Sequence, residues 1–340
     1  MANAQRPALS VVVIGRNEGD RLVKCLESVL ASHSVSPSVS TVPPEIIYVD
    51  SNSSDGSPER AAALGVHVIP VQPQRPSAAL GRNAGWRVAQ ADTILFLDGD
   101  TLLHPDFINH ALTALHDPQV AVVWGHRREL HPEQSLYNRV LDLDWVYAAG
   151  ESEFCGGDAL VRKSVLEQVG GFSEDLIAGE EPELCQRIRA AGYKILHIDQ
   201  PMTLHDLAIT SWQAYWRRAF RAGYAYAEVS QRLAGSAFPL WQSDCRRNAR
   251  HSLVLIGIAI AAIAAAVSLQ SLLPLCAMLG LYLGLSLRSA SRAKWKQASP
   301  ATLLLYGVHS HIQQLPITVG QLSYWWDRWR QRRRFLIEYK

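Results

Sequence analysis

Short apolar runs that alternate with helical segments constrain the fold of this chain most strongly. Within residues 9–100, runs rich in Val and Ile are separated by stretches whose apolar residues recur at helical spacing. Strands are predicted at 8–15, 45–50, 66–71 and 93–98, and helices at 19–32, 57–65 and 80–91. The second predicted helix begins with Ser57 as the expected N-cap and Pro58 at the first helical position. Short strands in alternation with helices predict an α/β fold built on a parallel sheet.

Acidic residues gather where these predicted strands end. They are Glu18, Asp50, Asp55, Asp98 and Asp100. Ligands of parallel α/β sheets bind beyond the carboxyl ends of the strands. The stretch ILFLDGDT (94–101) carries a strand directly into Asp98 and Asp100. A solvated turn is the alternative for D-G-D alone, but two carboxylates at a strand end can also hold Mg²⁺ or Mn²⁺ with positions left for a diphosphate.

Two other nucleotide-binding classes lack their motifs here. The turn after the first predicted strand reads GRNEGD (15–20), whereas a dinucleotide-binding fold needs G-x-G-x-x-G at that place. A Walker loop is also absent from the sequence. A nucleotide site in this chain would therefore have to neutralise phosphate through a cation.

Charge is distributed very unevenly, and the basic part contains two uncharged segments. Residues 241–340 hold 13 Lys and Arg against three Asp and Glu. Within them, 253–269 and 272–287 carry no charge, and each spans roughly 25 Å as a helix. That length is slightly short of a hydrocarbon core of about 30 Å. With a turn at Gln270-Ser271 and basic flanks, both ends are expected on the cytoplasmic side. A buried helical pair of a soluble protein and a re-entrant hairpin are the alternatives.

The last residues mix tryptophan with arginine, in SYWWDRWRQRRRF (323–335). Such mixtures also bind nucleic acid, but beside a membrane hairpin they favour an interfacial anchor attracted to anionic lipid. No nucleic-acid partner is expected. The five cysteines show no metal-ligand spacing and are expected to be reduced thiols in a cytosolic setting. The first apolar run is too short for a signal peptide and is interpreted as a strand.

Several segments, taken in order over residues 8–206, resemble a family-2 glycosyltransferase with the GT-A fold. They are VVVIGRNEGDRLVKCLESVL, IIYVDSNSSDGS, GRNAGW, ILFLDGDT, CGGDALVRKSVLEQVGGFSED and GEEPELCQRIRAAGYKI. The resemblance implies a Rossmann-like, mostly parallel sheet that binds a nucleoside-diphosphate sugar. A C-terminal helical, membrane-associated region would follow it.

The resemblance also implies roles for individual residues. Glu18 and Asp50 would hold the base and ribose, Arg82 would approach the diphosphate, and Gly156, Gly157 and Asp158 would lie along the donor sugar. Asp98 and Asp100 match the D-x-D motif, with Asp100 in direct metal contact, Asp98 nearer the ribose, and His205 as a further metal ligand. Glu181 would be the general base, with Glu180 or Glu183 as the alternatives. Trp124, Gly125 and Arg127 would line the acceptor side.

Three departures from the family pattern bear on specificity. Ser51 stands where many relatives have a second acid, and the base position is Glu rather than Asp. QAYWRR (213–218) places Trp216 before Arg217, which differs from the Q-x-x-R-W element of processive members.

These features predict four regions. They are a GT-A catalytic domain at 1–206, an interfacial helical connector at 207–250, a hydrophobic hairpin at 251–288, and a basic-aromatic juxtamembrane tail at 289–340. The amphipathic segment 301–320 stays ambiguous between a third membrane element and a surface helix.

The expected activity is metal-dependent, inverting transfer of a sugar from a UDP- or GDP-sugar to a hydroxyl of a lipid or lipid-linked glycan. The expected place is the cytoplasmic face of the inner membrane. The alternatives are transfer to a polyprenyl phosphate and, in another class, a non-catalytic sugar-nucleotide-binding scaffold.

Overall fold

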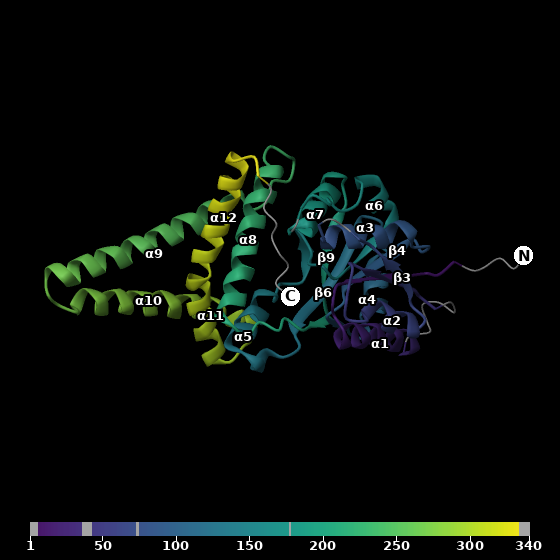
Figure 1. The fold of residues 1–340 in the computed structure, drawn as a ribbon, viewed down its shortest axis with the longest axis horizontal. Helices are drawn as coiled ribbons and strands as arrows, with labels where there is room; N and C mark the ends of the chain where they lie inside the picture. The colour runs from purple at the N-terminus through teal and green to yellow at the C-terminus, as the bar shows by residue number, and fades with distance from the viewer. Residues whose placement is uncertain (1–5, 36–42, 73–74, 177, 333–340) are drawn as a thin grey trace, which may run out of the picture. The chain divides into compact units, whose positions relative to one another are not determined.

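A computed structural model describes residues 6–35, 43–72, 75–176 and 178–332 (Figure 1). The chain divides into two compact units. The α/β unit comprises Met1–Leu130 and Trp145–Asp206, and the helical unit comprises His131–Asp144 and Leu207–Lys340. The predicted Arg333 and Arg334 of the basic-aromatic tail lie outside the described residues.

The α/β unit is built on one mixed sheet with the strand order β3-β2-β1-β4-β8-β6-β9-β5, and β7 pairs with β9. The strands are β1 (Ser10–Gly15), β2 (Glu45–Asp50), β3 (His67–Pro70), β4 (Thr93–Asp98), β5 (Thr101–Leu103), β6 (Val120–Glu129), β7 (Gly150–Ser152), β8 (Ala159–Arg162) and β9 (Lys194–His205). The first four are mutually parallel, which confirms the predicted α/β sheet. Beyond β4 the strand β8 runs antiparallel to both neighbours, so the second half of the sheet is mixed.

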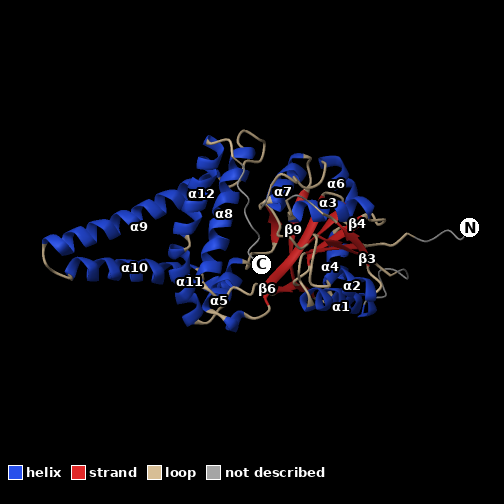
Figure 2. Cartoon of the chain, in the orientation of Figure 1, coloured by secondary structure: helices blue, strands red, loops and turns tan. Residues whose placement is uncertain are grey.

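Helices cover both faces of this sheet. They are α1 (Asp20–Val35), α2 (Ser57–Ala63), α3 (Ala78–Val88), α4 (Phe107–Ala114), α6 (Lys163–Val169) and α7 (Glu180–Ala190). Helices α3, α6 and α7 lie on one face, and α1, α2 and α4 lie on the other (Figure 2). Fully buried residues of β1 and β4, such as Val12 and Phe96, form the core between the layers.

Helix α3 packs unusually close to the sheet because a glycine faces it. A Cβ on Gly85 would overlap the Val12 side chain and lie 3.2 Å from Val49. The N-terminus of α3 is capped by Ser77, whose hydroxyl accepts from the amide of Leu80. This cap and this close approach fix where α3 carries Arg82.

The start of α2 differs from the prediction. Ser57 is not its N-cap; Gly56 occupies that position with a left-handed backbone (φ 81°) and no side-chain cap is formed. The Ser57 hydroxyl instead accepts from the amide of Gly19, 3.0 Å away. Because the Ser57 hydroxyl is bonded to the amide of Gly19, it does not cap its own helix. The serine ties the loop after β1 to α2 instead.

The helical unit holds the other helices of the described chain. They are α5 (Leu136–Asp144), α8 (Trp212–Arg232), α9 (Gln242–Ser268), α10 (Leu273–Arg292), α11 (Pro300–Ile312) and α12 (Gln314–Trp329), with short 3₁₀ turns at Pro132–Gln134 and Lys294–Lys296. Helix α8 lies in the region 207–250, where the sequence predicts a helical connector. It lies beside α12 (Figure 1), where a Cβ on Gly223 or Gly320 would overlap the backbone of the partner helix.

Helices α9 and α10 form the predicted hairpin, turned at Gln270 with a left-handed backbone (φ 47°). Both are long and apolar enough to cross a membrane, and only 11% and 6% of their apolar windows are buried. Residues such as Ile260 and Leu279 are 63% and 60% exposed. Within the described residues, the two helices are therefore not a buried pair. The segment 301–320 covers nearly all of α11 and only the first part of α12, and these helices of 13 and 16 residues are short for a membrane crossing.

Candidate active site

The loops after β1 and β2 are joined to one another beyond the carboxyl ends of the strands. The Asn17 side chain, on a left-handed backbone (φ 55°), accepts from the amide of Ser54 at 2.8 Å. Asp50 is buried, and it accepts from the Tyr48 hydroxyl at 2.8 Å and from the Ser53 amide at 2.9 Å. Both loops are therefore held in place before any ligand arrives.

Glu18 lies at the same end of the sheet and is also buried. Its carboxylate pairs with Arg21 at 2.9 Å. A Cβ on Gly99, between the two aspartates of the D-x-D motif, would lie 3.3 Å from the Glu18 side chain. The predicted base- and ribose-binding loop and the D-x-D turn are thus packed against each other.

Arg82 lies at the centre of a carboxylate cluster and is 2% exposed. Its Nη1 is 3.0 Å from Glu180 and 2.9 Å from Glu181, and its Nη2 is 2.9 Å from Asp98. Helix α3 thereby connects the end of β4 to the N-terminus of α7. A buried guanidinium with three carboxylates around it keeps acids together that would otherwise repel each other.

Arg127 approaches the same cluster from β6. Its Nη2 is 3.4 Å from Asp98, and its Nε is 3.7 Å from Asp158. Burial by itself would raise the pKa of Asp98, but the guanidinium groups of Arg82 and Arg127 outweigh it and hold that pKa below its usual range. Asp98 is therefore an anion in the physiological pH range.

Asp158 holds the turn that contains the two glycines. It accepts from the amide of Asp98 at 3.0 Å and from the Thr203 hydroxyl at 2.8 Å. Burial raises the pKa of Asp158 to about 6. Attraction to Arg127 lowers this pKa and repulsion from Asp98 raises it, so the rise caused by burial persists. A Cβ on Gly157 would lie 2.5 Å from Arg82 and 3.0 Å from Asp98, so a side chain there would displace the Arg82 guanidinium.

The predicted base candidates differ in exposure. The Glu180 side chain is 5% exposed and that of Glu181 is 17% exposed, although both contact Arg82. Glu183, one turn further along α7, pairs with Arg187 at 2.8 Å and accepts from Ser173, so its carboxylate serves the helix. Of these candidates, Glu181 is the most accessible to a substrate.

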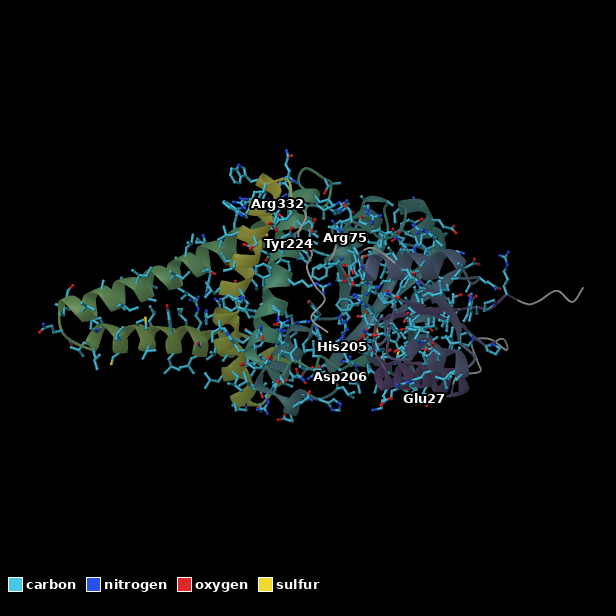
Figure 3. All side chains as sticks on the ribbon, in the orientation of Figure 1. Glu27, Arg75, His205, Asp206, Tyr224 and Arg332 are labelled. Carbon is cyan, nitrogen blue, oxygen red and sulfur yellow. The ribbon has the colours of Figure 1, made fainter. Side chains whose placement is uncertain are left out.

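Asp98, Asp100 and His205 form a group with the geometry of a metal site. One ligand atom from each lies within 4.8 Å of the others. His205 is labelled in Figure 3, and its Nε2 is 3.3 Å from Asp100. Both residues are buried. Two carboxylates and one imidazole fit Mn²⁺, whereas Mg²⁺ favours all-oxygen sites. His205 is far from the two aspartates in the sequence, and the pairing of β5 with β9 brings it beside them.

Trp145 is a neighbour of this group that the sequence did not reveal. Its ring lies 5.2 Å from the His205 ring, and the Arg127 guanidinium stands 4.8 Å from it. Nothing in the local pattern around residue 145 marks it, because both partners lie on strands distant in sequence. Of the predicted acceptor-side residues, Arg127 joins the carboxylate cluster. The Trp124 ring packs against His197, and Gly125 has no room for a Cβ beside Phe107.

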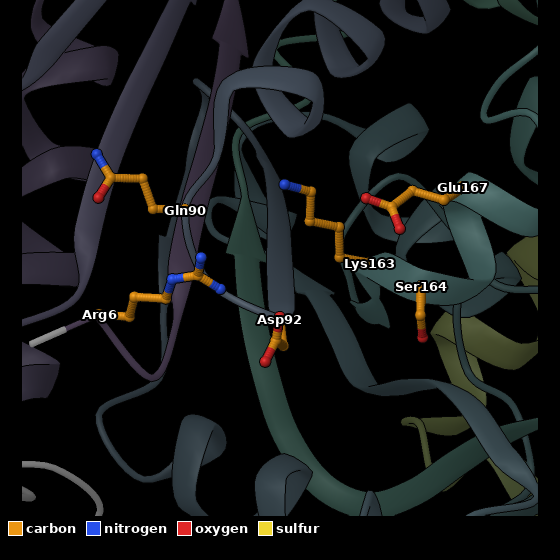
Figure 4. Close-up of a pocket in the computed structure, with 6 residues that line it drawn as sticks. All are labelled: Arg6, Gln90, Asp92, Lys163, Ser164 and Glu167. Carbon is orange, nitrogen blue, oxygen red and sulfur yellow. The ribbon is translucent and has the colours of Figure 1, made fainter.

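A separate cavity of about 410 Å³ lies at the other end of the sheet (Figure 4). Its lining includes Arg6, Asp92 and Lys163. Asp92 directly precedes β4, so the cavity lies at the amino end of that strand, away from Asp98. The Lys163 ammonium donates a hydrogen bond to the carbonyl of Ala89 at 2.7 Å. None of the predicted site residues lines it.

The sequence matches two related protein families. Residues 10–170 match Glycosyl transferase family 2, and residues 93–307 match Glycosyl transferase family group 2. Glycosyltransferase AglE of Haloferax volcanii is 24% identical over 235 residues, which cover 66% of this chain and 74% of that protein. The O-antigen chain rhamnosyltransferase WbaN of Salmonella anatum is 24% identical over 200 residues, which cover 54% of this chain and 63% of that protein. Less than two thirds of WbaN is therefore matched.

The fold also matches a solved structure over almost its full length. That structure is the mannosyltransferase PcManGT from Pyrobaculum calidifontis in complex with GDP-Man and Mn²⁺, with a TM-score of 0.67 and 20% identity. The alignment covers 96% of this chain and 89% of that one. At this identity the likeness concerns the fold, which is GT-A, and the activity follows from the family matches. The chain is a family-2 glycosyltransferase.

Proposed function

We propose that this enzyme transfers a sugar, with a divalent metal ion and with inversion, from a nucleoside-diphosphate sugar to a hydroxyl of a lipid or lipid-linked glycan at the cytoplasmic face of a membrane. The observation that carries the proposal is the Asp98, Asp100 and His205 group beside the Arg82 cluster. A candidate metal site for the diphosphate and a carboxylate that can act as base, Glu181, therefore lie next to each other, as glycosyl transfer requires.

Asp100 and His205 are the proposed main metal ligands, with Asp98 completing the group. Asp98 is shared with two guanidinium groups, whereas Asp100 has its 3.3 Å contact with His205. A bound Mn²⁺ would supply charge neutralisation on the leaving diphosphate. The Mn²⁺ in the PcManGT complex supports this choice of ion. Glu18 and Asp50 are proposed to hold the base and ribose from the loops after β1 and β2.

Glu181 is proposed as the base that takes the proton of the attacking hydroxyl. Arg82 holds its Oε1 at 2.9 Å, which orients the carboxylate and links it to Asp98 on the donor side. One base opposite the leaving group allows attack from the far side of the sugar ring, and that attack inverts the anomeric centre. Glu180 is proposed to position Arg82, because it is almost completely buried.

The donor sugar is proposed to lie along Gly156, Gly157 and Asp158. The close approach of Gly157 to Arg82, Asp98 and Glu181 supports this placement, because it brings the glycine turn against the residues proposed for the diphosphate, the ribose and the base. GDP-Man in PcManGT supports a nucleoside-diphosphate sugar as the donor.

A membrane location is proposed from the helical unit. Helices α9 and α10 expose apolar side chains over most of their length, and Arg246, Arg247 and Arg292 flank the apolar segments. Basic residues at both ends of the hairpin favour a cytoplasmic catalytic unit. Exposed Trp325, Trp326 and Trp329 of α12 fit an interfacial position.

The test is glycosyl transfer to a membrane lipid extract by detergent-purified enzyme, with Mn²⁺ and a panel of UDP- and GDP-sugars. Glu181→Gln is expected to lower the turnover number by about 10²- to 10⁴-fold, the usual contribution of a general base, and to leave donor binding intact. Glu183→Gln, on the same helix, is the matched control and should retain activity. Nearly unchanged turnover in Glu181→Gln would contradict a hydroxyl acceptor and favour a polyprenyl phosphate, which is already an oxyanion.

A further inference from the structure

Trp145 connects two parts of the active site that are otherwise contributed by different strands. It lies between α5 and β7, where the chain enters the second segment of the α/β unit. Its ring meets the ring of His205 edge to face, with an interplanar angle of 69°. On the Arg127 side, the guanidinium carbon stands 4.8 Å from the ring centroid, within the range of a cation–π contact.

We propose that Trp145 is a positioning residue of the metal site, which sets the affinity for Mn²⁺ by fixing the His205 ring and the Arg127 guanidinium. This inference rests on the proposed metal-dependent function. It adds a residue to which neither the family pattern in this sequence nor the D-x-D motif points.

The first contact acts on a metal ligand directly. His205 presents Nε2 toward Asp100 at 3.3 Å, and this geometry depends on the rotation of the imidazole about its side-chain bonds. An aromatic edge against the ring restricts that rotation. Ligand histidines are commonly oriented by a neighbouring group, and loss of that group typically lowers metal affinity or activity by about 10- to 100-fold.

The second contact acts on the aspartate of the group through Arg127. That guanidinium lies 3.4 Å from Asp98 and 3.7 Å from Asp158. With its face covered by Trp145, the guanidinium is held beside both carboxylates. Trp145 therefore contacts His205 directly and reaches Asp98 through one intermediate.

The test is direct measurement of Mn²⁺ binding by electron paramagnetic resonance, in which the six-line signal of free Mn²⁺ decreases as the ion binds. The variants are Trp145→Leu, which keeps apolar bulk without a ring, and Trp145→Phe, which keeps a ring. Trp124→Phe is the matched control, because its ring packs in the same unit against His197 and Tyr147. Circular dichroism and thermal unfolding report whether each variant is folded.

Trp145→Leu is expected to raise the Kd for Mn²⁺ by about 10- to 100-fold. Trp145→Phe should recover most of the affinity, and Trp124→Phe should bind like the wild type. In turnover assays, the Trp145→Leu loss should be reversed at high Mn²⁺, so that the KM for Mn²⁺ rises while kcat recovers.

An unchanged Mn²⁺ affinity in folded Trp145→Leu would overturn the inference. A raised acceptor KM in that variant would then assign the ring to acceptor binding. The proposed function is tested separately by His205→Ala: if the wild type binds no Mn²⁺, or if this variant binds it as well as the wild type, the metal site itself is wrong and the role of Trp145 fails with it.

Discussion

At the scale of single residues, Arg82 links the donor and acceptor sides of the active site. It is buried and contacts carboxylates from β4 and from α7, residues 16 and 98 positions away in the sequence. Removal of one partner from such a cluster leaves buried charge uncompensated. The buried guanidinium is therefore expected to contribute to stability as well as to the arrangement of the site.

Arg82→Met is expected to lower the free energy of unfolding of the α/β unit by about 3–5 kcal/mol, because Asp98, Glu180 and Glu181 then repel each other without compensation. Urea unfolding followed by tryptophan fluorescence measures the change. Arg87→Ala is the control on the same helix, since its pair with Glu174 is exposed and worth about 0–1 kcal/mol. Equal effects of the two variants would contradict the central role of Arg82.

The glycine turn gives a second prediction at this scale. Gly157→Ala is expected to lower kcat/KM by about 100-fold, because a methyl group there displaces Arg82 and Asp98, and small misplacements of reacting groups cost that much. In Gly156→Ala the added carbon would meet only Arg127, at 3.8 Å, so steady-state kinetics should show a much smaller loss. A reversed order of the two variants would be incompatible with the observed packing.

Much of the site at this scale was predictable, and the reason is local. Asp98 and Asp100 follow an apolar strand, so position in the sequence already places them at its carboxyl end. Trp145 and the pairing of Arg127 with Asp98 were not predictable, because they depend on strands that meet only in the folded sheet. The Ser57 N-cap prediction was wrong for a similar reason, since the Ser57 hydroxyl accepts a hydrogen bond from the amide of Gly19, which is distant in sequence.

At the scale of elements, the parallel half of the sheet and its helices could be predicted from periodicity. The strands β1 to β4 and the helices α1 to α3 each satisfy a local pattern of apolar spacing. The antiparallel β8 and the bulged pairing of β6 with β9 could not be predicted, since these pairings join segments that are distant in sequence. The D-x-D turn was therefore placed correctly at the end of β4, but the strands β6, β8 and β9 beside it were not predicted.

The contact between α3 and the sheet supplies a prediction at this scale. Gly85→Ala is expected to destabilise the enzyme by about 1–3 kcal/mol, because overpacking against Val12 outweighs the better helix propensity of alanine. A double-mutant cycle with Val12→Ala measures the coupling by urea unfolding. The double variant should be more stable than the sum of the single effects allows. Strict additivity would contradict direct packing.

At the scale of the whole molecule, the sequence distinguished a charge-free hairpin from a catalytic half rich in acids. The uncharged runs predicted α9 and α10, because a long apolar helix with basic flanks can be recognised from its local sequence alone. The sequence could not settle whether these helices were buried against other elements, and their exposure excludes that alternative in the described chain.

Membrane attachment through the hairpin is tested by two charges on its exposed apolar surface. The combined substitutions Ile260→Arg and Leu279→Arg are expected to shift the enzyme from the carbonate-washed membrane fraction toward the soluble fraction, since each arginine costs about 2.5–3.5 kcal/mol at a helix centre in lipid. Val88→Arg, at a 48% exposed position of the α/β unit, is the control and should stay with the membrane. Retention of the double variant would argue against lipid around this surface.

The central claim is metal-dependent transfer from a nucleoside-diphosphate sugar, and its most direct test is nucleoside diphosphate release by the purified enzyme with membrane lipid extract as acceptor. Each UDP- and GDP-sugar is supplied after chelation of metal ions, then again with Mn²⁺, to the wild type and to Asp100→Asn. The account predicts release from one donor that depends on added Mn²⁺ and is lost in the variant. Release that is equal with and without Mn²⁺, or equal in Asp100→Asn, would contradict it.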